Sequence, residues 1–432
     1  MTRPNAEHYD ALVVGGGPAG SISALVLARG GARVALVDKA AFPRDKACGD
    51  LVGPRGVQAL EDLGLDLGGP RVGDMEVIGP TGRKVLLPAR PGITYPGHAV
   101  VASRLEFDAF LHQAAIDAGA VPYTGRADTP HFDDGDQLDG FEVRNDGSAA
   151  AKLTADVVIG ADGALTRVGA AAALVNEQEV LWGFAVRGYI SAEVGLPRIH
   201  FWEPSRWAGY PGYGWVFPGE RGHANVGLGV AACGDRRVAA RAVRDLPQFV
   251  QDAGLDPSRL GPTLGGWLKM GMVGTVPASG RTLLVGDAAG LVNSLQGEGI
   301  AQALASGRAA AEAVLKVGAS GAASLYRDEL AARYGSFASM TAAVTSWMID
   351  RPRGVAAAGR VLTARGVGSA LAGGWAIYWN DLLDGAAPGW SRRMARLAER
   401  TGGLLTSRTT ARRAVQESLS TLTDPVAAAE SR

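Results

Sequence analysis

The sequence predicts an α/β protein of the α+β two-domain type. A Rossmann-like nucleotide-binding domain is interleaved with an antiparallel-sheet domain, and a helical C-terminal region follows. A strand–glycine turn–helix–strand unit begins near residue 9, and a strand ending in a Gly-Asp turn begins near residue 281. Strands rich in aromatics and glycine lie between these two segments. The 432 residues also exceed the roughly 250–300 that one hydrophobic core accommodates, so two domains are expected.

The composition of the chain argues against several classes of protein. Basic and acidic residues are equal in number, 43 of each, so no net charge attracts nucleic acid. A hydrophobic share of 47% is typical of a globular protein with a large core. Two cysteines form no disulfide framework, and the first residues hold no apolar signal segment, so we expect a cytoplasmic protein. No apolar run reaches the roughly 20 residues of a membrane-spanning helix.

The first element is a βαβ unit, with a strand over 11–14, a helix over 18–29 and a strand over 33–38. Its turn has the pattern GxGxxG and comprises Gly15, Gly17, Pro18, Ala19 and Gly20. Such glycines allow a tight turn and a close approach of the backbone to a pyrophosphate at the helix N-terminus. Asp38 ends the second strand, where its carboxylate would accept a ribose hydroxyl and repel a 2′-phosphate. The unit therefore predicts FAD or NAD rather than NADP.

The later elements follow the same periodicity rules. We expect helices over 54–64 and 104–118, a β-meander over 128–153 and a buried strand before the turn at 162. Strands occupy 180–275 around one helix over 235–253, and a long helix follows the turn near 287. These elements divide the chain into a discontinuous nucleotide domain (1–70, 100–175 and 276–322), a sheet domain (71–99 and 176–275) and a helical region (323–432).

Two further motifs decide between the nucleotides. VVIGADGALTRV covers 157–168 and RTLLVGDAAGLVNSLQGEGI covers 281–300. Together with the glycine turn they resemble the FAD-dependent oxidoreductases of the para-hydroxybenzoate hydroxylase fold. The resemblance implies that Asp287 holds the ribityl chain of FAD, that Asp162 and Gly163 lie near the pyrophosphate and that Arg104 reaches the cofactor. The remaining positions that it places around FAD are Lys39, Arg44, Cys48, Gly49, Gly286, Gly297, Gly299 and Ile300.

Within that superfamily, FPRDKACGD (42–50) and YGWVFPGERGHANVGLG (213–229) resemble the geranylgeranyl reductase family. The resemblance covers about residues 9–310 and is strongest to actinobacterial enzymes that saturate one isoprene unit of a menaquinone side chain. It implies hydride transfer from reduced FAD to a carbon–carbon double bond of a hydrophobic, isoprenoid substrate. Two positions depart from the family pattern, Leu51 in place of glycine and Ser294 in place of proline. Substrate shape and reaction outcome therefore stay open.

Aromatic residues support an apolar substrate. Tyr213, Trp215 and Phe217 alternate, so a strand would project all three from one face. Four more aromatics precede them: Phe201, Trp202, Trp207 and Tyr210. They form either ordinary core or a wall for a hydrophobic or lipid ligand.

The candidates for catalysis are few. Cys48 and Asp50 would shape or protonate the site, with Tyr213 and Trp215 lining it. Cys48 follows Arg44 and Lys46, a basic setting that would lower the pKa of the thiol, although an ordinary small buried residue is the alternative. The sequence has no HExxH, CxxC, P-loop or GxSxG motif, and its histidines lack metal-ligand spacing, so no metal is expected.

The sequence leaves alternatives for the reaction, the electron donor and membrane contact. A flavin monooxygenase or halogenase is the second interpretation, and a flavin-binding lipid carrier without turnover is the third. No second GxGxxG unit is present, so the electron donor is either NAD(P)H docking transiently or a ferredoxin-like reductant. Residues 391–414 hold seven arginines and one acidic residue, which favours a solvated helical face over peripheral contact with the inner face of a membrane. The sequence does not indicate an oligomeric state.

Overall fold

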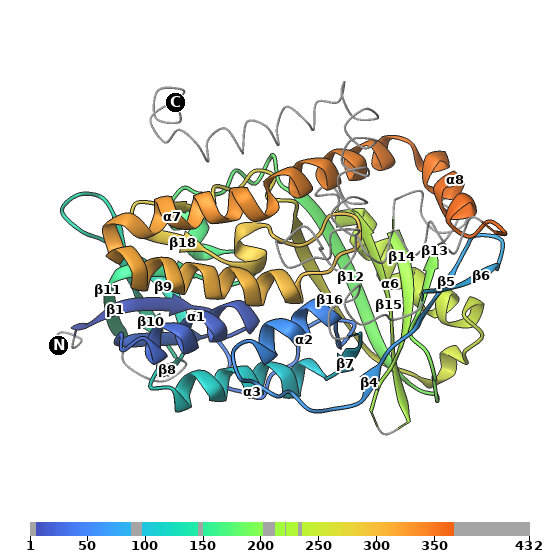
Figure 1. Ribbon diagram of the computed structural model, residues 1–432, viewed down its shortest axis with the longest axis horizontal. Helices are drawn as coiled ribbons and strands as arrows, with labels where there is room; N and C mark the ends of the chain where they lie inside the picture. Colours follow the sequence, from blue (N-terminus) through green and yellow to red (C-terminus); the bar gives the residue numbers. More distant parts are fainter. Residues whose placement is uncertain are drawn as a thin grey trace.

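The computed structural model describes residues 6–87, 97–145, 150–201, 212–220, 222–231 and 236–366. Several features singled out in the sequence lie outside these residues: Trp202, Trp207, Tyr210 and the arginine-rich stretch 391–414. The mixed α/β architecture agrees with the predicted fold class. Figure 1 shows the part with β1, β11 and α1 at one end of the molecule and the part with β12–β16 at the other.

The larger sheet has eight strands in the order β17-β18-β11-β1-β2-β8, and β10 and β9 continue from β11. Strand β1 pairs in parallel with β2 and with β11, and β11 pairs in parallel with β18. Fully buried apolar runs form β2, β18 and the ends of β1 and β11 (residues 11–14 and 157–160), as expected for a parallel sheet covered on both faces. The strands are β1 (Ala6–Val14), β2 (Val34–Asp38), β8 (Val121–Thr124), β9 (Arg126–Phe132), β10 (Leu138–Arg144), β11 (Ala151–Gly160), β17 (Ala278–Ser279) and β18 (Thr282–Leu284).

Three helices pack beside this sheet: α1 (Pro18–Arg29), α3 (Arg104–Asp117) and α7 (Ile300–Asp350). Helices α1 and α7 approach closely, because a Cβ on Gly307 would lie 2.3 Å from the Ala19 carbonyl oxygen. The Ser23 hydroxyl also donates to the Gly307 carbonyl across this contact. Gly318, with φ 69°, interrupts α7, and the ribbon turns back there (Figure 1). The long helix predicted after the turn near 287 is the segment of α7 before Gly318, and both segments reach the core of this domain.

The second sheet has seven strands in the order β16-β12-β15-β14-β13-β5-β6. All of its pairs are antiparallel except β13 with β5. Helix α6 (Arg236–Asp252), predicted over 235–253, covers one face, where the Phe249 ring fills the space above Gly214. The strands are β5 (Met75–Ile78), β6 (Lys84–Leu87), β12 (Leu181–Ser191), β13 (Arg198–Phe201), β14 (Gly212–Pro218), β15 (His223–Ala231) and β16 (Leu260–Met270).

A small sheet connects the two parts: β3 (Leu51–Val52), β7 (Ala99–Val101) and β4 (Arg71–Val72). Strand β4 lies in the segment assigned to the sheet domain, yet it pairs with β7 and not with the seven-stranded sheet. The remaining elements are α2 (Pro54–Glu61), α4 (Arg167–Ala171), α8 (Pro352–Leu362), η1 (Pro257–Arg259) and η2 (Gly286–Ala289).

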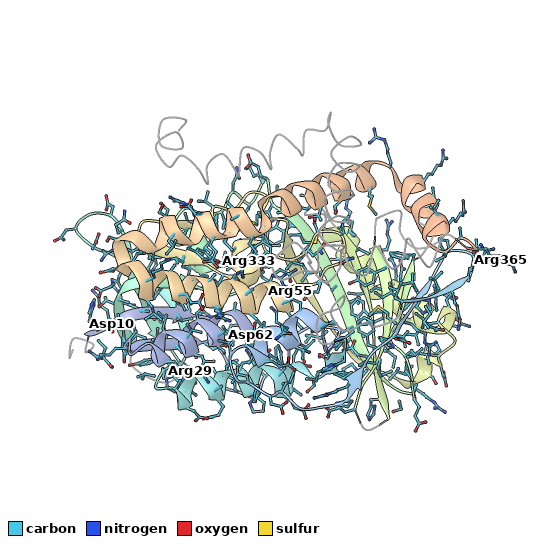
Figure 2. All side chains as sticks on the ribbon, viewed as in Figure 1. Asp10, Arg29, Arg55, Asp62, Arg333 and Arg365 are labelled. Atoms are coloured by element: carbon cyan, nitrogen blue, oxygen red, sulfur yellow. The ribbon has the colours of Figure 1, made fainter. Side chains whose placement is uncertain are left out.

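Helix α2 is joined to α7 by Arg55, whose Nη2 donates to the Tyr334 hydroxyl at 3.0 Å. The guanidinium also lies 5.5 Å from the centre of the Tyr334 ring, and Figure 2 shows Arg55 between the two helices. Within the described ranges, no helix has both the length and the apolar character that crossing a membrane requires.

Candidate functional site

The three sequence motifs meet at one edge of the eight-stranded sheet. Gly15 has φ 110°, and a Cβ there would lie 2.2 Å from the carbonyl oxygen of Ala161, the residue after β11. A Cβ on Gly286 would lie 3.0 Å from the Ala19 methyl group. Residues far apart in sequence are therefore in van der Waals contact here, and only glycine fits at Gly15 and Gly286 without displacing backbone or methyl groups.

The glycine turn leaves the first turn of α1 open. Gly17 is the N-cap, Pro18 occupies the first helical position, and no side chain caps the helix. A Cβ on Gly20 would lie 1.8 Å from the Gly15 carbonyl oxygen, so the helix start and the strand end pack without side chains between them. Uncapped N–H groups at a helix start, reached over bare backbone, suit a phosphate.

Asp38 lies beside this turn and is nearly fully buried. Its Oδ2 accepts hydrogen bonds from the Gly16 amide at 2.8 Å and from Arg44 Nη2 at 3.3 Å. Its Oδ1 accepts from the Ala40 amide at 3.0 Å. Lys39, the next residue, is exposed and does not join the cluster.

A buried carboxylate organises the two arginines of the site. Arg104, the first residue of α3, donates from Nε and Nη2 to the two oxygens of Asp108 at 2.6 and 2.7 Å. Arg44 Nη1 also donates to Asp108 Oδ2 at 2.9 Å. Burial lowers the pKa of Arg104, but Asp108 and Cys48 together raise it by more, and the net pKa lies above the ordinary value. The guanidinium stays charged beside Cys48, with which it shares a hydrogen bond.

Cys48 does not have the lowered pKa that its basic neighbours predicted. Arg44 is bound to Asp108, and Lys46 Nζ lies 3.4 Å from Asp287 Oδ2, so neither cation is directed at the thiol. Burial raises the pKa of Cys48, and the nearby Arg104 opposes this only in part. The prediction that Cys48 has a lowered pKa was therefore wrong. The positive charges of Arg44 and Lys46 interact with the carboxylates of Asp108 and Asp287 and not with the thiol.

Asp50 follows two residues later in a left-handed conformation, with φ 57°. Its Oδ2 accepts from the Tyr189 hydroxyl at 2.5 Å and from Asn225 Nδ2 at 2.9 Å. The Asn225 amide also donates to the Cys48 carbonyl at 2.8 Å, and Trp215 Nε1 donates to Asn225 Oδ1 at 2.9 Å. Burial raises the pKa of Asp50, whereas the bonds from Tyr189 and Asn225 lower it, with a net increase. One network therefore joins Cys48, Asp50 and Trp215.

The aromatic wall consists of Tyr213, Trp215 and Phe217 on β14. Neighbouring ring centres lie 6.1 and 6.3 Å apart, so the three side chains share one face as their alternation predicted. The hydroxyl of Tyr213 donates to the Gln296 carbonyl, which places the wall against the loop before α7. A Cβ on Gly49 would lie 2.9 Å from the Phe217 ring, so the Cys48–Asp50 segment packs on the same face.

The loop after Asp287 completes the cluster. Gly297 has φ 68°, and a Cβ there would lie 3.5 Å from the Tyr213 hydroxyl. Gly299 is the N-cap of α7, Ile300 is its first residue, and a Cβ on Gly299 would lie 3.6 Å from Asp287 Oδ1. At this helix start the Ala301 amide donates to Glu298 Oε1 at 3.0 Å.

Asp162 and Gly163 lie in the turn after β11. Asp162 Oδ2 accepts from the amides of Arg167 and Val168 at 2.6 and 3.2 Å, which fixes the start of α4. Asp162 Oδ1 is buried, and none of the described residues hydrogen-bonds to it. Gly163 has φ 85°, and the space beside its Cα is open.

Comparison with known proteins identifies this arrangement. A family model described as an FAD binding domain matches residues 8–326. Menaquinone reductase of Mycobacterium tuberculosis is 34% identical over 345 residues, with 76% of this chain and 80% of that protein covered. The chain belongs to the geranylgeranyl reductase family of FAD-dependent oxidoreductases. A second relative, geranylgeranyl diphosphate reductase of Rhodobacter capsulatus, is 32% identical, with 71% of this chain and 75% of that protein covered.

Solved structures share the fold of this reductase family member. A geranylgeranyl bacteriochlorophyll reductase-like protein from Thermoplasma acidophilum has a TM-score of 0.72 at 21% identity and covers 91% of this chain and 100% of its own. A flavin-dependent brominase has a TM-score of 0.66 at 17% identity and covers 91% and 99%. At these identities the likeness concerns the fold alone.

The residues of this family member fit FAD. The glycine cradle at Gly15 and Gly20 would be filled by any Cβ, and α1 begins without a side-chain cap. Two buried polar atoms beside the motifs, Asp162 Oδ1 and Lys269 Nζ, have no hydrogen-bond partner in the part of the chain that the structure describes. A dinucleotide has hydroxyl and phosphate groups that need hydrogen-bond donors and acceptors, and the amides at the start of α1, Asp162 Oδ1 and Lys269 Nζ could provide them.

Lys269 is a residue that the sequence reasoning missed. It lies on β16 with no exposed surface, and its charge interacts with Asp162 and Asp287. Burial lowers its pKa to about 8, although both carboxylates raise it. The available signal was that Lys269 is the one charged residue of β16. Tyr189 and Asn225 were missed as well, because their partners lie far away in the sequence. Asp108 was missed although Arg104 stands four positions before it on α3.

Proposed function

We propose that this protein reduces a carbon–carbon double bond of a hydrophobic, isoprenoid substrate with FAD as its cofactor. The observation that carries the proposal is the contact between Tyr213 and Gln296, which joins the aromatic wall to the loop after Asp287. An apolar surface beside flavin motifs suits an uncharged substrate that must be aligned with a flavin. The printed names of the relatives, menaquinone reductase and geranylgeranyl diphosphate reductase, support the isoprenoid class.

Bound and reduced, FAD supplies a hydride. The chain supplies alignment and the exclusion of water, with Tyr213 and Trp215 lining the substrate site and Cys48 and Asp50 shaping or protonating it. The residues proposed to hold FAD are Gly15, Gly17, Pro18, Ala19, Gly20, Asp38, Arg44, Cys48, Gly49, Arg104, Asp162, Gly163, Gly286, Asp287, Gly297, Gly299 and Ile300. Lys39 is the weakest member of the predicted set, because its side chain points to solvent.

The two sheets receive different tasks in this proposal. The segments 1–70, 100–175 and 276–322 hold the cofactor, and the segments 71–99 and 176–275 hold the substrate. The electron donor is NAD(P)H docking transiently or a ferredoxin-like reductant, since the glycine turn at Gly15 is the one such motif in the sequence. A lipid substrate favours a cytoplasmic protein that touches the inner face of the membrane.

An anaerobic reoxidation experiment tests the proposal. The flavoprotein is photoreduced, mixed with a geranylgeranyl lipid and followed at the absorbance maximum of oxidised flavin. This lipid has no quinone ring, so reoxidation reports on its double bonds alone. We expect reoxidation without O₂ and a product two mass units heavier. If the flavin stays reduced until air is admitted, the proposal fails and the monooxygenase or halogenase interpretation takes its place.

A matched pair of variants locates the substrate. Trp215→Leu removes the central ring of the aromatic wall and is expected to lower the reoxidation rate. Trp267→Leu, in the same sheet, alters a tryptophan that packs against Phe184 and is expected to keep the rate. Equal losses in both variants would contradict the placement of the substrate at the wall.

A further inference from the structure

The two oxygens of Asp50 have different surroundings. Oδ2 accepts two hydrogen bonds, from Tyr189 and Asn225. Oδ1 is buried and has no partner among the described residues. A bare oxygen in a dry site disfavours the ionised carboxylate, because the charge is not solvated there. These surroundings raise the pKa of Asp50, so the neutral acid, with its proton on Oδ1, extends to higher pH than in an exposed aspartate.

The two donors are held rigidly. Tyr189 and Asn225 are direct cross-strand partners in the β12–β15 pair, so both side chains leave the sheet on one face. Trp215 donates to Asn225 Oδ1, which fixes the amide so that its NH₂ group points toward Asp50 and the Cys48 carbonyl. Asp50 itself is held in the left-handed region, a costly conformation for a non-glycine residue that is common at functional sites.

Tyr189 also links Asp50 to the outside. Arg187, two residues earlier on the same face, stacks 4.3 Å from the centre of the Tyr189 ring. Arg187 is buried but binds both oxygens of Asp45, which is exposed. Tyr189 is half-buried and Asp50 is buried. The side chains of Asp45, Arg187, Tyr189 and Asp50 therefore contact one another in succession, from the exposed Asp45 to the buried Asp50.

We propose that Asp50 is the proton donor of the double-bond reduction, with Tyr189 and Asn225 as positioning residues that hold Oδ2 and leave Oδ1 to the substrate. This inference rests on the proposed function. Bound and reduced, FAD would supply a hydride to one alkene carbon, and the π electrons of the double bond would take the proton from Asp50 Oδ1 at the other carbon. The carboxylate left behind is stabilised by its two donors at Oδ2, and Oδ1 regains its proton from water once the product has left.

The titration of Asp50 is the first readout, and it needs no substrate. The groups that face Asp50 are Tyr189 and Arg187 from β12, Arg104 from α3 and the neighbouring Cys48. Infrared difference spectra of the oxidised flavoprotein should contain a protonated carboxyl band at neutral pH that is absent from Asp50→Asn. Absence of a band that depends on Asp50 would overturn the inference.

Tyr189→Phe tests whether the Tyr189 hydroxyl acts on Asp50 through its hydrogen bond or contributes only to packing. Loss of a hydrogen bond to the charged form raises the pKa of Asp50, by about one to two pH units for a single bond. The carboxyl band should persist to correspondingly higher pH, and the alkaline limb of alkene reduction should move by the same amount. Tyr123→Phe, at a tyrosine on β8, is the control and should leave both unchanged. A slower Tyr189→Phe enzyme with an unmoved pH profile would overturn the role of Tyr189.

Activity supplies the last readout. Asp50→Asn should still bind FAD and accept electrons by photoreduction, while reoxidation by the geranylgeranyl lipid falls about 100-fold or more, as expected for loss of a general acid. Reoxidation of Asp50→Asn at the wild-type rate would overturn the inference and leave the proposed function intact. Failure of the wild-type protein to reduce the lipid would reject the proposed function itself.

Discussion

Lys269 offers a direct test of the electrostatics of the site. Its ammonium group is buried without a hydrogen-bond partner among residues of the described ranges, and burial lowers its pKa from 10.5 to about 8. Each pH unit of displacement corresponds to 1.36 kcal/mol. Keeping Lys269 charged in the folded apoprotein at pH 7 therefore costs about 3 kcal/mol relative to the unfolded chain.

The sign of the pH dependence follows from the lowered pKa. Between pH 8 and pH 10.5 the unfolded chain binds the proton at Lys269 more often than the folded protein does. The free energy of unfolding therefore gains a contribution from Lys269 as the pH rises through this window. Lys269→Met keeps the length of the side chain and removes the charge, so we expect the variant apoprotein to be about 3 kcal/mol more stable at pH 7. The difference should shrink toward pH 10.5.

Urea unfolding of the two apoproteins at pH 7 and at pH 10 measures this difference. Lys316→Met, at an exposed lysine of α7, is the control and should change the free energy of unfolding by less than about 0.5 kcal/mol. Subtraction of the two curves cancels the other groups that titrate in the window. A stability difference that is the same at both pH values, or a destabilised Lys269→Met protein, would refute the reasoning.

Three further substitutions test the packing. Gly15→Ala should abolish the retention of FAD during purification, because the added Cβ would overlap a backbone carbonyl, whereas Gly31→Ala, also at positive φ but in open space, should retain it. Gly227→Ala should alter the fluorescence of Trp215, since a Cβ would lie 2.1 Å from its ring; an unchanged emission spectrum would contradict the packing. Tyr326→Phe removes a buried hydrogen bond to a carbonyl of β18 and should cost about 1–2 kcal/mol in urea unfolding.

Local features were predictable from the sequence. The glycine turn, Asp38 at the end of its strand and the alternation of Tyr213, Trp215 and Phe217 each depend on residues a few positions apart. Their geometry follows from helix and strand periodicity, so the predicted βαβ unit and aromatic face agree with the structure.

Long-range pairs were not predictable. Asn225 meets the Cys48 carbonyl across 177 positions, and Tyr189 meets Asp50 across 139. These contacts depend on strand register and on how one sheet lies against the other, which no local pattern encodes. The same limit explains the error at Cys48: the charges of Arg44 and Lys46 were visible, but their distant carboxylate partners were not.

The strand order of the eight-stranded sheet also constrains how the protein is made on the ribosome. Strand β1 is among the first segments to emerge, yet its neighbour β11 follows about 140 residues later, and β18 covers the other side of β11 only after residue 282. Until then a growing chain carries buried-type strands with unpaired edges, which are prone to aggregation. The proposed FAD site also stays incomplete over the same interval, because Gly286 is not yet in contact with Ala19. Loading of the cofactor is therefore a late event, and nascent chains stalled before residue 282 should depend on chaperones.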